Sequence, residues 1–203
     1  IVRGGMDLTL ENRYSRAEGM AKLHGTFGKH RLWDGFRSTD RVLGVVLFEE
    51  FRPAGGTKIS AGFDLKRYGG KALNAIGARD FGRHFITEAA PHLHAQQVVM
   101  GNIILNGGIR REHHSMFGGT WVPTMGVVAQ PDHRISLRMA VSKGFHSPTV
   151  KDLYLPFPAA NPDLKPERLW SLEGGAEVRL ADRLAMDFTL YRMKGEGIIQ
   201  PVF

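Results

Sequence analysis

Hydrophobic and polar residues alternate with a period of two along most of this chain. In the segment 134–142 the apolar positions are Ile135, Leu137, Met139 and Val141, and polar residues stand between them. The same pattern recurs in segments 6–14, 57–67, 169–180 and 184–193. Successive side chains of a β-strand point to opposite faces of its sheet. The pattern therefore predicts strands with one apolar face and one polar face.

Weaker alternation, interrupted by Gly or Pro, predicts further strands at 18–30, 41–52, 86–99, 103–113 and 120–130. Together the segments predict about ten strands, most of them longer than the five or six residues usual in soluble proteins. We therefore expect an all-β fold.

Two kinds of connection separate the predicted strands. Short turns are expected at 15–17, 53–56, 100–102, 131–133 and 181–183, and longer links at about 31–40, 68–85, 114–119 and 143–168. Because the two kinds alternate, an antiparallel arrangement would place all short turns at one end, as in outer-membrane barrels. The sequence predicts an antiparallel up-and-down meander that forms part of a transmembrane β-barrel. A soluble antiparallel sandwich or barrel is the alternative, since its strands also alternate.

Composition narrows the functional classes. The 203 residues are 42% hydrophobic and include no cysteine, which excludes thiolate nucleophiles and Cys-based metal sites. No run approaches the roughly 18 apolar residues of a membrane helix. The net charge of +7 would suit nucleic acid, anionic lipid or an anionic ligand. The basic residues do not form a run interleaved with aromatic residues, so no nucleic-acid surface is predicted.

The proline-rich segment 144–170 carries two motifs. The first reads Gly144-Phe145-His146-Ser147-Pro148-Thr149 and is followed by Leu153-Tyr154; the second reads Asn161-Pro162-Asp163-Leu164-Lys165-Pro166-Glu167. Together they resemble a paired signature of TonB-dependent outer-membrane receptors. Residues 64–72, 108–112 and 122–126 resemble further landmarks of the siderophore and cobalamin class, so the resemblance covers about residues 55–200. His146 and Ser147 depart from the Arg-Ala of the family pattern.

The motif residues also predict the shape of the loop. Ser147 followed by Pro148 is typical of a helix start, with Ser147 as N-cap and the short helix ending at Tyr154. Proline and Asn-Pro turns stiffen the return path, and Glu167 is expected to tie the loop to an Arg or to backbone amides. We expect a shaping role rather than ligand contact for Phe145, Pro148, Asn161, Pro162, Leu164, Pro166 and Glu167.

The resemblance implies a fold, a location and partners. Receptors of this family are barrels of about 22 strands filled by a plug domain. Residues 1–203 are therefore expected to form a partial barrel domain, without the plug and the remaining strands. The implied function is energy-coupled uptake of a large nutrient across the outer membrane of a Gram-negative bacterium, in contact with outer-membrane lipid. The TonB energy-transducing protein would engage the missing plug. We place a ferric siderophore ahead of cobalamin as ligand, with haem third.

Candidate ligand-binding residues are the polar side chains expected at the lumen or the outer mouth: Lys66, His92, His94, Arg138, His146 and Tyr154. A water-filled lumen is also polar without binding a ligand, which is the alternative for each of them. His113 and His114 are adjacent on a strand, so at most one of them can reach the lumen. No metal site, cofactor or catalytic residue is predicted.

An enzyme is the alternative from another functional class, because ten-stranded outer-membrane barrels include proteases. Such an enzyme needs close acidic pairs and an Asp–His couple at the outer rim. No Asp-Asp pair occurs, and Asp132-His133 belongs to a predicted short turn at the other end.

Overall fold

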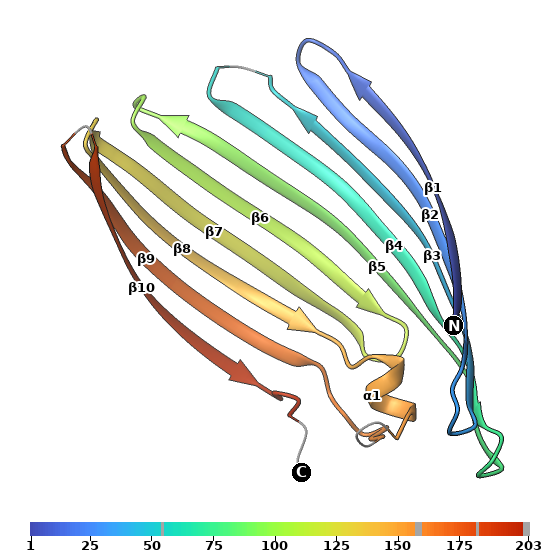
Figure 1. Ribbon diagram of the computed structural model, residues 1–203. Helices are drawn as coiled ribbons and strands as arrows, with labels where there is room; N and C mark the ends of the chain where they lie inside the picture. Colours follow the sequence, from blue (N-terminus) through green and yellow to red (C-terminus); the bar gives the residue numbers. More distant parts are fainter. Residues whose placement is uncertain (54, 157–159, 182, 201–203) are drawn as a thin grey trace.

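The computed structural model describes residues 1–53, 55–156, 160–181 and 183–200. These residues form ten strands and one short helix (Figure 1). In chain order the elements are β1 (Val2–Arg13), β2 (Ala17–Arg31), β3 (Phe36–Phe51), β4 (Thr57–Asn74), β5 (Arg79–Val99), β6 (Ile103–His114), β7 (Gly118–Asp132), β8 (Ile135–His146), α1 (Val150–Tyr154), β9 (Glu167–Ala181) and β10 (Leu184–Glu196).

All ten strands of the described residues belong to one antiparallel sheet, in the order of the chain from β1 to β10. Each strand pairs with its predecessor and its successor, except that β1 and β10 form the two open edges. In Figure 1 the sheet is a curved arc. At one end are the turns that the sequence predicted to be short, where β1, β3, β5, β7 and β9 finish, and we call them the short turns; α1 lies at the other end. The predicted all-β meander is confirmed, and the arc is not closed into a barrel.

The register of the strands gives the sheet two chemically different faces. Leu8, Leu23, Val45 and Leu65 are cross-strand partners on one face. The neighbouring row on the other face contains Asp7, His24, Lys66, Glu88 and His114. We call these the apolar face and the polar face. The alternation in the sequence therefore places aliphatic and polar side chains on opposite faces, as predicted.

The apolar face is not covered by other elements. Ile135, Leu137, Met139 and Val141 are all exposed. Among the described residues the buried hydrophobic side chains are only Phe36, Ala72, Ile86, Ala90 and Leu153. A soluble sandwich would bury its apolar faces against each other in one core. The structure therefore disagrees with that alternative.

The prediction of long links at 31–40, 68–85 and 114–119 is wrong. β2 and β3 are joined by residues 32–35, β4 and β5 by residues 75–78, and β6 and β7 by residues 115–117. The strands continue because backbone pairing persists beyond the apolar segment, for example between Phe36 and Asn74. Charged side chains interrupt the apolar alternation there but do not interrupt the backbone hydrogen bonds. Of the predicted long links, only the one between β8 and β9 is long.

The helix predicted in the proline-rich loop exists, but its cap is Thr149 rather than Ser147. The Thr149 Oγ1 accepts a hydrogen bond from the Asp152 backbone N–H (3.3 Å), and Asp152 Oδ2 accepts one from the Thr149 N–H (2.9 Å). This reciprocal pair is a capping box, which satisfies two backbone donors at the helix start. Pro148 lies before the cap and is buried. The helix ends at Tyr154, as predicted.

No helix among the described residues has both the length and the apolar character needed to cross a membrane.

Candidate functional site

Helix α1 is held on the polar face, against the outer end of β5. We call the end of the sheet opposite the short turns its outer end. Leu153 is fully buried. The Tyr154 ring stacks on the His84 ring of β5, with ring centroids 3.6 Å apart and nearly parallel planes. Together these contacts fix the start of the loop against the sheet.

The return path of the loop is tied down at two further points. The Asn161 N–H donates to the Asp152 carbonyl (2.9 Å), and its side-chain oxygen accepts from the Asp163 N–H (3.0 Å). Glu167 Oε1 accepts from the Ile199 N–H (2.6 Å), which confirms the predicted tie to a backbone amide. Glu167 Oε2 lies 3.2 Å from His146 Nδ1.

Several of the predicted shaping residues lie along the same path. Leu164 and Pro166 are half-buried, and Pro162 is exposed. Phe145 pairs with Arg168 where β8 meets β9. Their shaping role stays a prediction. Pro158, one of the prolines expected to stiffen the return path, lies outside the described residues.

A cavity of about 620 Å³ lies between α1 and the outer parts of the first strands. This outer-mouth cavity falls within the size range of sites for small organic ligands. Its lining includes aromatic and basic side chains contributed by the strands and by α1: Arg3, Phe36, Tyr68, Lys71, Phe81, His84, Lys151 and Tyr154. Aromatic rings and cations together suit an anionic ligand with an apolar body.

The charges around the outer-mouth cavity are only partly neutralised. Asp40 binds both Arg3 (3.3 Å) and His30 (3.0 Å). Lys71 pairs with Asp80 at 3.3 Å, whereas Lys151 has no ion-pair partner among the residues that the structure describes. The Gly82 backbone N–H and then the Lys71 ammonium lower the pKa of the Asp80 carboxyl, which lies at the tip of the hairpin. The lining therefore keeps a positive balance at neutral pH.

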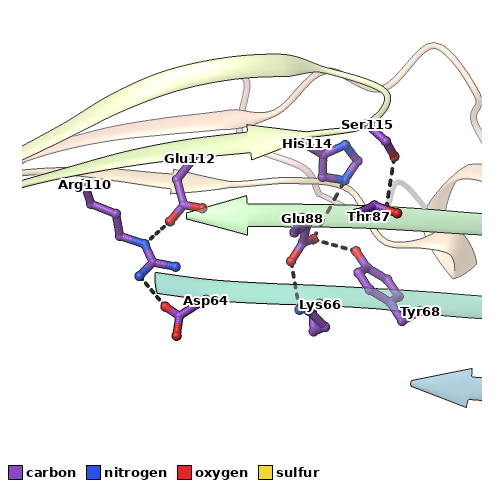
Figure 2. A network of polar contacts seen from close by, with 9 residues as sticks. All are labelled: Asp64, Lys66, Tyr68, Thr87, Glu88, Arg110, Glu112, His114 and Ser115. Atoms are coloured by element: carbon purple, nitrogen blue, oxygen red, sulfur yellow. Dashed lines mark hydrogen bonds and ion pairs between the residues drawn. The ribbon is translucent and has the colours of Figure 1, made fainter. Parts of the chain in front are cut away.

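Below this cavity, Glu88 joins three strands through a polar network on the polar face (Figure 2). Its Oε2 lies 2.8 Å from Lys66 Nζ, and its Oε1 accepts a hydrogen bond from the Tyr68 hydroxyl (2.7 Å). The ring of His114, buried on β6, approaches the same Oε1 with its Nε2 at 3.8 Å. The His114 Nδ1 accepts from the Met116 N–H (3.2 Å). Glu88 thus connects β4, β5 and β6.

Arg110 forms a second network beside the first (Figure 2). Its Nη1 donates to Asp64 Oδ2 (2.5 Å), and its Nε donates to Glu112. His92 Nδ1 lies 3.3 Å from the same Nη1 and 3.9 Å from Asp64. The guanidinium is therefore paired with two carboxylates.

The predicted binding residues do not form one cluster. Tyr154 lines the outer-mouth cavity, and Lys66 lies next to it through its contact with the Tyr68 ring (4.7 Å). Arg138 lies on β8 and forms a bidentate pair with Asp187 (2.7 and 2.8 Å). The His146 ring is paired with the Glu167 carboxylate. Lys66 and Arg138 thus both face carboxylates that the alternation pattern did not reveal.

The register of the strands determines which face of the sheet each of the predicted histidines is on. His92 and His94 lie on the polar face, where they are cross-strand partners of Gly62 and Ser60. His114 is on the polar face, whereas His113 pairs with Ala89 on the apolar face, so the two adjacent histidines lie on opposite faces, as predicted. Within the described part of the chain, no three His, Cys, Asp or Glu side chains are grouped closely enough to hold a metal ion.

The outer-mouth cavity contains residues that sequence reasoning missed: Arg3, Phe36, Lys71, Phe81, His84 and Lys151. They come from α1 and from four strands, β1, β3, β4 and β5, whose outer parts extend beyond the apolar alternation. The only sequence signal for them was the presence of aromatic and basic residues near the predicted outer links.

The Asp132–His133 pair considered for an enzyme lies at the opposite end. His133 Nδ1 and Asp132 Oδ1 are 2.6 Å apart, and both side chains are well exposed where β7 ends and the turn to β8 begins. The pair therefore has no access to the outer-mouth cavity.

Comparison with known proteins identifies the class. Residues 3–203 match the family model described as TonB dependent receptor-like, beta-barrel. The chain belongs to this family, as its motifs predicted. A search of curated protein sequences finds no match.

Solved structures agree on the fold. The siderophore receptor PirA from Pseudomonas aeruginosa superposes with a TM-score of 0.84 at 15% identity, covering 95% of this chain and 38% of that one. A variant of the ferric enterobactin receptor PfeA from the same organism gives 0.83 at 15% identity, with 96% and 34% covered. The copper transporter OprC gives 0.74 at 14% identity, with 93% and 38% covered. The chain thus spans little more than a third of the length of these receptors.

Proposed function

We propose that this chain is part of an outer-membrane receptor that takes up a large nutrient using energy from the inner membrane, with a ferric siderophore as the favoured ligand. The outer-mouth cavity carries the proposal. Its aromatic rings and its positive balance suit an anionic metal chelate, and partial desolvation strengthens charge attraction in a narrow mouth. The similar structures support the same ligand class, because PirA is named as a siderophore receptor and PfeA as a ferric enterobactin receptor.

The membrane location follows from the two faces of the sheet. The exposed aliphatic face has the character of a lipid-facing barrel surface, and the polar face that of a wet or plug-filled lumen. We infer that the family's plug, with its contact to the TonB protein, stands elsewhere in the full-length receptor. No covalent chemistry is assigned to the described residues.

Ligand class is tested by salt dependence. We expect the full-length receptor to bind ferric enterobactin about tenfold more weakly when ionic strength rises from about 0.05 M to about 0.5 M, because screening shortens the reach of the cavity charges. Binding is measured by quenching of intrinsic fluorescence. Binding of the anionic chelate that ignores salt would contradict the electrostatic argument and favour cobalamin.

Variants locate the binding at the cavity. Lys151→Gln and Tyr154→Ala are expected to weaken ferric enterobactin binding, because both side chains line the cavity. The matched control is Arg134→Gln, which removes an exposed charge at the short-turn end. Equal losses in the control would place the effect outside the cavity. If the receptor binds cobalamin or haem tightly and does not bind ferric enterobactin, the proposed ligand is wrong, but the proposed uptake function stands.

A further inference from the structure

The apolar face changes its chemistry toward the outer end of the sheet. On β3 the positions of this face are Leu47, Val45 and Leu43 and then, further out, Arg41, Thr39 and Arg37. On β4, Phe63 and Leu65 are followed by Arg67. Aliphatic side chains are thus replaced by basic ones on the same face.

The replacement involves four neighbouring strands. We call it the outer basic band, and its members on β2 to β5 are Lys29, Arg31, Arg37, Arg41, Arg67 and Arg83. All six residues are exposed. None of the six forms an ion pair with another described residue, and Arg67 has a different contact, lying 5.4 Å above the Phe85 ring.

Two cross-strand pairs in this region bring like charges together. Arg31 is the direct partner of Arg37 in the β2–β3 hairpin, and Lys71 is the direct partner of Arg83 between β4 and β5. Like charges directly opposite each other destabilise an antiparallel pair. Asp80 offsets Lys71 at 3.3 Å, whereas no described carboxylate pairs with Arg31 or Arg37. An anion from outside the described chain would remove this repulsion.

Aromatic side chains lie among and beside the basic residues of this face. Arg67 lies over Phe85, and further along the sheet Arg111 lies 5.1 Å above the Trp121 ring. Both pairs are on the apolar face and are partly or fully exposed. Aromatic rings collect at the level of lipid headgroups, and basic side chains extend from there toward the charged groups.

The opposite end of the same face has a different composition. Near the short turns, β2 presents Ala17 and Gly19, and β3 presents Phe51 and Glu49. Glu49 accepts hydrogen bonds from Asn12, at 3.2 and 3.3 Å. The excess of positive charge is therefore confined to one end of the lipid-facing surface, which corresponds to one leaflet.

We propose that the outer basic band binds the phosphate groups of lipid headgroups in the leaflet at the outer end of the barrel. The proposal rests on the membrane embedding inferred under the proposed function. Guanidinium groups match phosphate geometry and bind it through paired hydrogen bonds. The band would hold phosphorylated lipids around the mouth. Their phosphates would screen the repulsion between Arg31 and Arg37.

The test uses the purified full-length receptor in a neutral detergent. Binding of short-chain phosphatidic acid, whose headgroup is a phosphate monoester, is compared with binding of short-chain phosphatidylcholine by native mass spectrometry. We expect phosphatidic acid to bind preferentially, and the triple variant Lys29→Gln/Arg31→Gln/Arg37→Gln, none of whose residues lines the outer-mouth cavity, to lose about tenfold or more of that affinity. The matched control, Arg13→Gln/Arg134→Gln/Arg183→Gln, removes three exposed charges at the short-turn end and should keep it.

The outcomes separate the two proposals. Equal binding of both lipids by the wild-type receptor, or an unchanged affinity in the triple variant, overturns the lipid site alone. Displacement of phosphatidic acid by an equal concentration of inorganic phosphate would overturn the assignment to lipid. A receptor that does not fractionate with outer membranes overturns the proposed function. If the triple variant does not fold, Arg37→Gln alone should still show a partial loss, and no loss there counts against the site.

Discussion

Among single residues, Thr149 has the most sharply testable role. It caps α1 and so fixes the helix that carries Tyr154 into the outer-mouth cavity. Thr149→Ala removes the hydroxyl that accepts from the Asp152 N–H (3.3 Å) and donates to Asp152 Oδ2 (2.7 Å), and it is expected to destabilise the helix by about 1 kcal/mol. Hydrogen exchange of the amides in residues 150–155 should become faster. Ser147→Ala is the matched control, because the sequence favoured Ser147 as the cap; faster exchange in that variant instead would contradict the assignment.

The limits of sequence reasoning are visible in the same residues. Alternation placed Lys66 and Arg138 on the polar face correctly. It did not show that Glu88 and Asp187 neutralise them, because those partners stand on other strands and depend on register. The shift of the helix cap by two residues has a similar cause. Both Ser147 and Thr149 can cap a helix, and only Thr149 has an acidic residue at the third helical position, Asp152.

For the elements, Glu88 is a side chain that joins two of the central strands. Its carboxylate links β4 to β5 through Lys66 and Tyr68. Glu88→Gln replaces the carboxylate by a neutral group of the same shape, so the free energy of unfolding of the full-length receptor is expected to fall by about 1–2 kcal/mol. Equilibrium unfolding in urea measures it. The exposed Glu11→Gln on β1 is the control, and an equal loss there would show that charge alone matters.

The strands themselves were the most predictable elements. Period-two alternation located all ten of them among the described residues, and tight turns fixed most of their inner ends. Their outer ends were not predictable, because the basic side chains between Arg37 and Arg41 remove the apolar signal while the ladder continues. The outer-mouth cavity lies at these extended ends, which explains why most of its lining was missed.

For the whole molecule, the two open edges determine how this chain should behave alone. β1 and β10 each present one side without a strand partner among the described residues. Exposed strand edges pair with other chains. We expect the 203-residue chain, refolded alone in detergent, to associate in a concentration-dependent way in analytical ultracentrifugation. The full-length receptor should sediment as a single species under the same conditions. A strictly monomeric isolated chain would show that its edges are protected.

The strand order has a consequence for how the receptor is assembled. Because every described strand pairs only with its neighbours in the chain, the contacts of the sheet join residues of consecutive strands rather than of distant parts of the chain. Such a fold has a low contact order for a β-protein, and a low contact order favours rapid folding. The sheet can therefore grow one hairpin at a time, each new strand finding a template already in place. Only the final pairing of the β1 and β10 edges with strands from elsewhere requires a search over long loops, and that step is expected to limit the rate of assembly.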